Sequence, residues 1–320
     1  MGSAITDGIH RISFTIDGKL HAFHAAETPR GVVLFDTGVP DTPETEFEPF
    51  LADLGYELAD VHTVVFTHAD ADHMGGNVAL REANPDVTYA AHVDDLPLIA
   101  SVDAIWDQRY RAFEPYGIEY GSDVVDWLDE MLPPTDEPVD VGLRGGEQIP
   151  MADGRTLELH HAPGHTDGHL VAHEPESDVV IGGDVVYPEG AFDVEGNALQ
   201  PPPYVDADAY LQTIELLRGL APETLSLTHF EPLHGDEVPE FLDRAYDWAV
   251  GFESTLVSVL EDADAPLTVP ELIDRITERR GSFGLDLDLA FPITSHLERL
   301  AERGRVAETT SDDLPAFTLG

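Results

Sequence analysis

The sequence predicts a mixed α/β fold with a small helical module at its C-terminal end. Short apolar, β-branched runs alternate with helical patterns along most of the chain. Four of these runs are each followed by a histidine or an aspartate. After residue 238 the pattern changes to three helices and a terminal hairpin.

The N-terminal half begins with alternation of apolar and polar side chains over residues 9–39, which is typical of antiparallel strands. Apolar residues at helical spacing predict a helix over 43–54. The apolar run 61–67 predicts a buried strand, and residues 87–91 predict another. Residues 101–132 contain an aromatic-rich helical pattern, broken at Pro115 and Gly117, that lies between two groups of candidate site residues.

Three further strands are predicted over 157–161, 179–181 and 224–227, with an amphipathic helix over 206–218 before the last of them. These elements suggest a catalytic domain over residues 1–238. A separate module over residues 239–320 would then hold the remaining elements, which are helices over 238–260, 271–280 and 291–303 and a terminal hairpin.

The charge balance is strongly acidic. Among 320 residues, 16 are basic and 63 are acidic, which gives a net charge of -47, and Lys19 is the only lysine. Such a charge repels nucleic acid and anionic membranes, and it destabilises the fold unless salt screens it. We therefore expect adaptation to a high-salt cytoplasm, as in a halophilic archaeon.

The chain contains no cysteine, which excludes disulfides, thiolate catalysis and cysteine-ligated metal sites. A metal must therefore be held by histidine and carboxylate. No apolar run approaches the ~18 residues of a membrane span, and no basic region followed by an apolar stretch indicates a secretory signal. We expect a cytoplasmic protein without membrane partners.

Candidate metal ligands follow the predicted strands. The run 61–67 is followed by His68, Asp70, Asp72 and His73. Three other strands are followed by His165, Asp184 and His229. Because a rigid strand holds the loop at its end, all seven side chains can converge at one edge of the fold.

In combination, these motifs resemble those of the metallo-β-lactamase superfamily. Its signature is His-x-His-x-Asp-His, then a distant His, a bridging Asp and a final His. The matching segments are Thr67-His68-Ala-Asp70-Ala-Asp72-His73, Pro163-Gly-His165, Gly183-Asp184, Thr228-His229 and the earlier Asp36-Thr37-Gly38. The resemblance covers roughly residues 5–240 and implies an αββα sandwich with metals at one edge of its two sheets.

The resemblance also implies the roles of these residues. His68, Asp70 and His165 would hold a first divalent metal. Asp72, His73 and His229 would hold a second, with Asp184 bridging the two. Zinc is the expected metal, with manganese or iron as alternatives. A hydroxide that bridges the metals would attack the substrate, and Asp72 would also orient it as a catalytic residue.

Asp70 departs from the family pattern, which has histidine there. A carboxylate replaces an imidazole in many metal sites, so Asp70 is kept as a ligand. Its added charge should favour harder metals and raise the pH at which bound water ionises. The alternative is a degraded centre that binds a single metal.

Several other residues are weighed against simpler roles. His234 is an alternative to His229 as the last ligand, and His169 is a candidate for the pocket wall. Asp36 is interpreted as structural, because no second Asp-Thr-Gly completes an aspartic-protease pair. Residues 101–140 are expected to cap the site. The core or the surface is the expected place of His21, His24, His62 and His92.

The C-terminal module resembles the small winged-helix domain of some β-lactamase-like hydrolases, most clearly over residues 293–306. The first functional hypothesis is a hydrolase of a small ester, thioester or lactone. The alternatives are a nuclease that holds RNA or DNA with the module, an iron oxygenase of the same fold, and a non-catalytic binding protein. The acidic charge disfavours nucleic acid as a partner, and a homodimer stays open.

Overall fold

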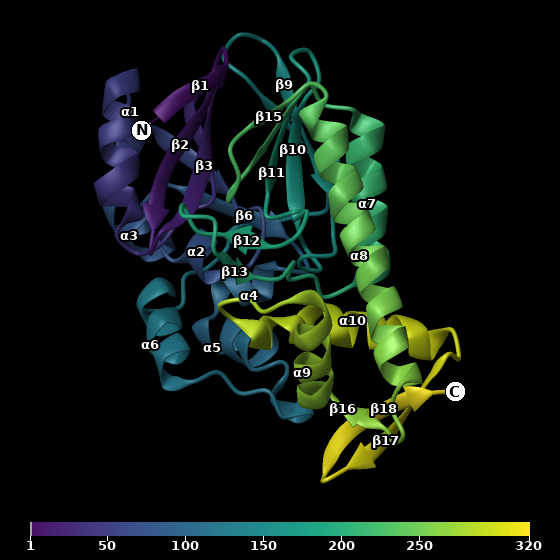
Figure 1. The fold of residues 1–320 in the computed structure, drawn as a ribbon. Helices are drawn as coiled ribbons and strands as arrows, with labels where there is room; N and C mark the ends of the chain where they lie inside the picture. Colours follow the sequence, from purple (N-terminus) through teal and green to yellow (C-terminus); the bar gives the residue numbers. More distant parts are fainter. Residues whose placement is uncertain (1) are drawn as a thin grey trace.

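Two β-sheets lie face to face, and helices cover the outer face of each (Figure 1). The computed structural model describes residues 2–320. In spatial order, the first sheet contains β1 (Gly2–Thr6), β2 (Ile9–Ile16), β3 (Lys19–Thr28), β4 (Gly31–Phe35), β5 (Val61–Val65), β6 (Thr88–His92) and β7 (Val141–Leu143). The second contains β15 (Leu233–His234), β14 (Thr224–Leu227), β11 (Val179–Gly183), β10 (Leu170–Glu174), β9 (Thr156–His161) and β8 (Gln148–Pro150).

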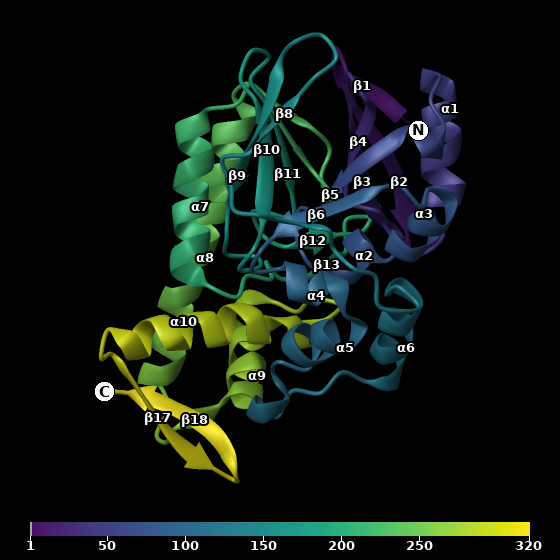
Figure 2. The ribbon, with the colours of Figure 1, turned by 180° about the vertical axis from the view of Figure 1, so that it is seen from behind.

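The helices on the side of the first sheet include α1 (Glu48–Leu54) and α3 (Asn77–Ala83), and those on the second sheet are α7 (Ala207–Leu220) and α8 (Glu237–Glu261) (Figure 2). Between the sheets, apolar side chains of both pack together, among them Phe35, Val65, Leu159 and Ile181. Alternation along each strand explains this layer, since every second side chain points inward. The predicted α/β class and the four-layer order of helix, sheet, sheet and helix are confirmed.

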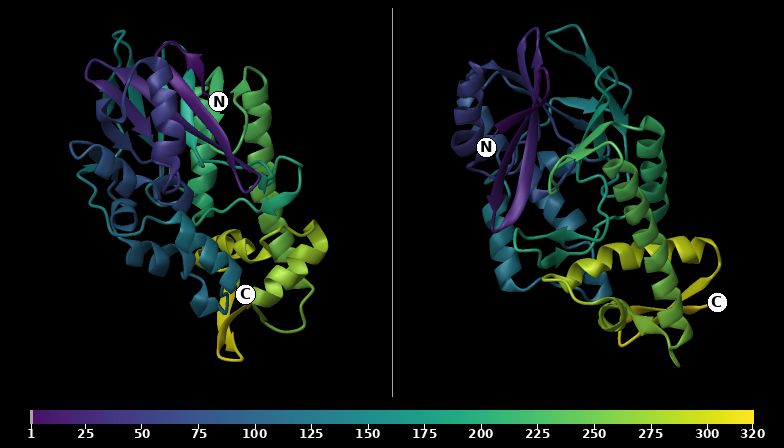
Figure 3. Two further views of the ribbon diagram at one scale, coloured as in Figure 1. Left: turned by 90° about the vertical axis from the view of Figure 1, so that its left-hand side faces the viewer. Right: turned by 45° about the horizontal axis from the view of Figure 1, so that its top comes forward.

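The remaining elements gather at one end of the sandwich. They include α2 (Ala71–Met74), α4 (Leu96–Ala100), α5 (Val102–Ile105), α6 (Ser122–Met131) and the small β12 (Ala191–Phe192) and β13 (Ala198–Gln200) pair. The C-terminal segment adds α9 (Val269–Arg280), α10 (Ala290–Glu302), β16 (Leu267–Thr268), β17 (Val306–Ser311) and β18 (Leu314–Leu319). Figure 3 shows this segment below the sandwich, with the end of α8 running into it.

Predicted and observed elements agree where the pattern is strong. The helix predicted over 43–54 begins as a π-helical turn at Pro43–Phe47 and continues as α1. The three predicted C-terminal helices appear within two residues of their expected ends. The helical pattern predicted over 101–132, with breaks at Pro115 and Gly117, appears as α5, two short helical turns and α6. The edge strands β1, β7 and β8 were not predicted.

One apolar cluster joins the sandwich to the C-terminal segment. It contains Leu225 of the second sheet, Phe252 of α8 and Leu300 of α10, all fully buried. A polar link runs beside it, since the Tyr204 hydroxyl lies 2.8 Å from His296 Nε2. Helix α8 therefore belongs to both parts, and the domain boundary at residue 238 stays a prediction. None of the helices within residues 2–320 is long and apolar enough to span a membrane.

The shared cluster gives a stability prediction. Phe252→Ala removes a fully buried ring and should lower the free energy of unfolding by about 3–5 kcal/mol. Val250→Ala is the matched control on the same helix, because Val250 is 40% exposed and should change stability by no more than about 0.5 kcal/mol. Urea denaturation at constant salt measures both, and equal losses would contradict a core that continues through α8.

Candidate metal centre

The segment that follows β5 is held in place by Asp36. The Asp36 carboxylate accepts hydrogen bonds from Thr67 N (2.7 Å) and Thr67 Oγ1 (2.7 Å), and its Oδ2 lies 2.9 Å from His73 Nδ1. Asp36 adopts a left-handed backbone (φ 66°), which aims the carboxylate across the sheet edge. The structural role expected for Asp36 agrees with these contacts.

The other candidate ligands come from the second sheet. His165 lies in the loop between β9 and β10, Asp184 directly follows β11, and His229 follows β14. The His165 loop passes close to α7 at Gly164, where an added Cβ would lie 2.5 Å from Tyr210 Cα and φ is +133°. Only glycine allows this approach, which brings the loop to the sheet edge.

All seven predicted ligands lie together at this edge. Asp70 Oδ2 is 3.6 Å from His68 Nε2 and 3.1 Å from His165 Nε2. Asp184 spans the next pair, with Oδ1 3.5 Å from His73 Nε2 and Oδ2 3.0 Å from His229 Nε2. These separations are those of donor atoms arranged around shared divalent ions.

Unpartnered polar atoms provide a test of whether these residues fit metal ions. His68 Nε2, His73 Nε2, His229 Nε2 and Asp184 Oδ1 are buried and have no hydrogen-bond partner among residues 2–320. Leaving such atoms unpaired is unfavourable, and a bound cation removes the penalty. Burial also lowers the pKa of His68 and of His229 to about 4, so both are neutral imidazoles able to donate a lone pair.

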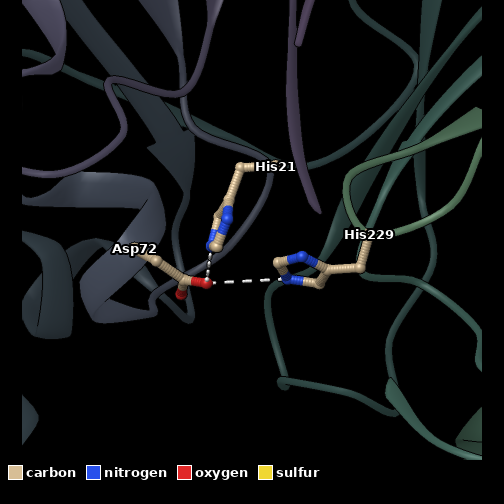
Figure 4. A group of neighbouring side chains, drawn as sticks. All are labelled: His21, Asp72 and His229. Atoms are coloured by element: carbon tan, nitrogen blue, oxygen red, sulfur yellow. Dashed lines mark hydrogen bonds and ion pairs between the residues drawn. The ribbon is translucent and has the colours of Figure 1, made fainter. Parts of the chain in front are cut away.

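His21 belongs to the same site, although the sequence pattern assigned it to the core or the surface. Its Nε2 lies 3.0 Å from Asp72 Oδ2, and His229 Nε2 lies 3.5 Å from the same oxygen (Figure 4). His229 is oriented by a 2.7 Å hydrogen bond from Nδ1 to Leu20 O. Strand alternation was the available signal, because it places His21 on the same face of β3 as the buried Phe23.

Asp70 is held by two residues of the aromatic segment 101–140. Arg109 forms a bidentate ion pair with Asp70, in which Nε donates to Oδ1 at 3.0 Å and Nη2 donates to Oδ2 at 2.6 Å. The Tyr110 hydroxyl donates to Asp70 Oδ1 at 3.0 Å, and Arg109 Nη1 donates to His165 O at 3.1 Å. Burial alone would raise the pKa of Asp70, but the Arg109 charge holds it well below its usual range.

The Arg109–Asp70 ion pair changes the effect on metal preference that we expected from Asp70. Replacing histidine with aspartate adds one negative charge to a first metal site, and Arg109 places one positive charge directly against it. The site therefore keeps nearly the charge balance of an all-histidine first site. The stronger preference for hard metals that Asp70 alone predicts is correspondingly reduced. Sequence patterns could not locate Arg109, which is far from Asp70 along the chain.

The gathered side chains lie at the floor of a pocket of 560 Å³. Asp70, Asp72 and Asp184 are exposed to it. Its walls are largely apolar and come from the β2–β3 hairpin, the aromatic segment, residues 199–203 and the C-terminal segment. The apolar wall residues are Ile16, Val124, Trp127, Leu128, Leu199, Pro203, Leu285 and Phe291.

Two other histidines lie differently from the candidates above. His234 is exposed on β15 and its Nδ1 lies 3.1 Å from Thr224 Oγ1, so it is not part of the gathered group. His169 was expected in the pocket wall, but it is not among the residues that line the pocket. It stacks behind His68 with ring centroids 4.8 Å apart, and its Nε2 accepts a hydrogen bond from Asp184 N. It therefore supports the ligands from behind.

Comparison with known families agrees with this geometry. The sequence model of the Metallo-beta-lactamase superfamily matches residues 25–229, which include every candidate ligand except His21. The chain belongs to this superfamily.

Two named relatives are distant from this chain in sequence. The chain is 25% identical over 245 residues to the probable metallo-hydrolase YqjP of Bacillus subtilis, covering 68% of each protein. It is 25% identical over 218 residues to a hydroxyacylglutathione hydrolase of Thermosynechococcus vestitus, covering 68% of this chain and 64% of that protein. Both relatives carry names of hydrolases.

Solved structures of the superfamily show the same fold over nearly the whole chain. The family protein TTHA1429 of Thermus thermophilus has a TM-score of 0.74 at 21% identity, covering 99% of this chain and all of that one. A beta-lactamase domain protein of Burkholderia ambifaria has a TM-score of 0.73 at 17% identity, covering 100% and 93%. The likeness in fold therefore includes the C-terminal segment.

Metal analysis can test the choice between His229 and His234. His229→Ala should lower the metal content of the purified protein, because it removes a donor atom of the gathered group. His234→Ala should retain the full content, since its ring lies outside that group. Elemental analysis after dialysis against a weak chelator measures both, and a larger loss in His234→Ala would reverse the assignment.

The support that Arg109 gives to Asp70 predicts a second effect on metal binding. Arg109→Met should weaken binding at the first metal site about 10–100-fold, because the Asp70 carboxylate loses its orienting partner. Arg111→Met is the control, since Arg111 is half exposed and its ion pairs within residues 2–320 are with Asp107 and Glu114, away from Asp70. Competition with a chromophoric chelator measures the affinity, and unchanged affinity in Arg109→Met would show that Asp70 needs no such partner.

Proposed function

We propose that the protein is a hydrolase of small esters, thioesters or lactones that uses two divalent metal ions, with zinc expected. The observation that carries this proposal is the 560 Å³ pocket directly above the gathered histidines and aspartates. Its volume suits a small molecule, and its apolar walls suit an acyl chain or a ring. The C-terminal segment supplies part of the wall through Leu285 and Phe291.

Divalent ions at this site would lower the pKa of a bound water and polarise the scissile carbonyl. The residues of the chain provide the remaining functions. Asp72 accepts from His21 and faces the pocket, so we assign it to orient the attacking water. The Tyr187 hydroxyl donates to Asp184 Oδ2 and fixes that carboxylate between His73 and His229. No serine or cysteine nucleophile is needed.

The name of the Thermosynechococcus relative, hydroxyacylglutathione hydrolase, describes the hydrolysis of a thioester, which lies within the proposed class. A nuclease is the weaker alternative, because the net charge of -47 opposes phosphate binding and the pocket is lined by Asp17, Asp123 and Asp288. An iron oxygenase of the same fold uses the same kind of ligands and is separated from a hydrolase by its products.

A substrate panel tests the proposal. A thioester, an aryl ester, a lactone, a phosphodiester and single-stranded RNA are incubated with zinc- or manganese-loaded protein at high salt. We expect turnover within the first three, and Asp72→Ala should lower kcat/KM about 10²–10⁴-fold. His234→Ala should retain full activity. Turnover of RNA alone, or oxygen consumption by the iron-loaded protein without hydrolysis, would overturn the proposal.

A further inference from the structure

Lys19 is the only lysine of the chain, and its side chain lies in the pocket. It stands at the start of β3, next to the tip of the β2–β3 hairpin. The hairpin tip is tied to the aromatic segment, since Trp127 Nε1 donates to Asp17 Oδ2 at 2.9 Å. Lys19 Nζ lies 3.6 Å from Asp72 Oδ2, and its side chain is 15% exposed. Its position is therefore fixed at the pocket floor.

The pocket contains two cationic side chains, Lys19 and Arg109. Arg109 Nε and Nη2 both donate to Asp70, and Arg109 Nη1 donates to His165 O. Lys19 makes a single ion pair among the described residues, with Asp72. An ammonium group has three donors, so the pair with Asp72 leaves Lys19 with donors for a molecule in the pocket.

The Asp72 oxygen that Lys19 approaches is shared with His21 and His229. A divalent ion held by this group would neutralise most of the negative charge of Asp72. The Lys19 ammonium then lacks a carboxylate within 4.0 Å that balances its charge, and it can pair with an anion in the pocket. Because the side chain is largely buried, salt screens such a pair less than it screens a surface pair.

We propose that Lys19 forms an anion subsite and that the substrate is an ester or thioester with a carboxylate near its reacting carbonyl. This inference rests on the proposed hydrolase function. The apolar remainder of the substrate would lie against apolar wall residues such as Val124, Trp127 and Phe291. Water adds across the C–O or C–S bond, and the products are a second carboxylic acid group and an alcohol or a thiol. The acidic groups Asp17 and Asp123 favour a singly charged carboxylate over a doubly charged phosphate.

A matched pair of substrates tests the subsite. Two thioesters are compared that differ only in a free carboxylate or its methyl ester. Lys19→Gln should raise KM for the acidic thioester roughly 10–100-fold, which corresponds to the loss of one charged hydrogen bond. The KM of the neutral thioester should rise much less, because that substrate has no carboxylate to pair with Lys19. Lys19→Arg should restore most of the KM, and Arg30→Gln, at an exposed turn, is the charge-matched control.

A binding measurement separates this inference from the proposed function. Trp127 lines the pocket, so its fluorescence reports binding of hexanoate and of uncharged hexanol without turnover. Lys19→Gln should weaken hexanoate and leave hexanol unchanged. This result would support the subsite even if no thioester were hydrolysed. Equal loss of kcat on both thioesters would show that Lys19 only positions Asp72, and tighter binding of hexyl phosphate than of hexanoate would overturn the carboxylate assignment.

Discussion

Three carboxylates meet at one edge of the sandwich, and their mutual repulsion is the constraint that shapes the site. Asp72 and Asp184 are buried, Asp70 is 16% exposed, and all three face the same pocket, so each needs positive charge close by. Asp70 receives it from Arg109, and Asp72 from Lys19. Asp184 lies between His73 and His229, where unpartnered histidine nitrogens and a carboxylate oxygen fit a divalent ion. Every protein cation in the pocket is thus paired with a candidate ligand.

This pairing connects the pocket wall with the metal centre. Arg109 and Tyr110 belong to the aromatic segment, whose later residues Trp127 and Leu128 line the pocket. The Tyr120 hydroxyl then donates to Asp288 at 2.6 Å, which joins the segment to the C-terminal part. Burial raises the pKa of Asp288 to about 6, so this hydrogen bond holds a carboxyl that is costly to bury charged. A change at Asp70 is therefore expected to affect the wall that contacts the substrate.

The sequence allowed the fold class and the seven gathered side chains to be predicted, because both depend on local patterns. A buried strand is recognisable from its apolar run, and the residue after it must lie at the sheet edge. His21, Lys19 and Arg109 were missed as site residues for the opposite reason. Their places depend on how a hairpin returns and on how an irregular segment folds back over the sheet, and neither is encoded in a short motif. The edge strands β7 and β8 contain three residues each, too few for a periodic signal.

The two cations of the pocket, Lys19 and Arg109, lie where mobile ions of the solvent have little access. The net charge of -47 leads us to expect a high-salt environment, where mobile ions would screen the charges on the surface. Mobile ions do not enter a packed site in the same way, so a largely enclosed carboxylate such as Asp70 needs a cation supplied by the chain. Arg109 is only 5% exposed, and its planar fork matches the carboxylate better than an ammonium would. Lys19 is a compact point charge with further donors, so it instead suits the carboxylate of a substrate that binds and is released in each turnover.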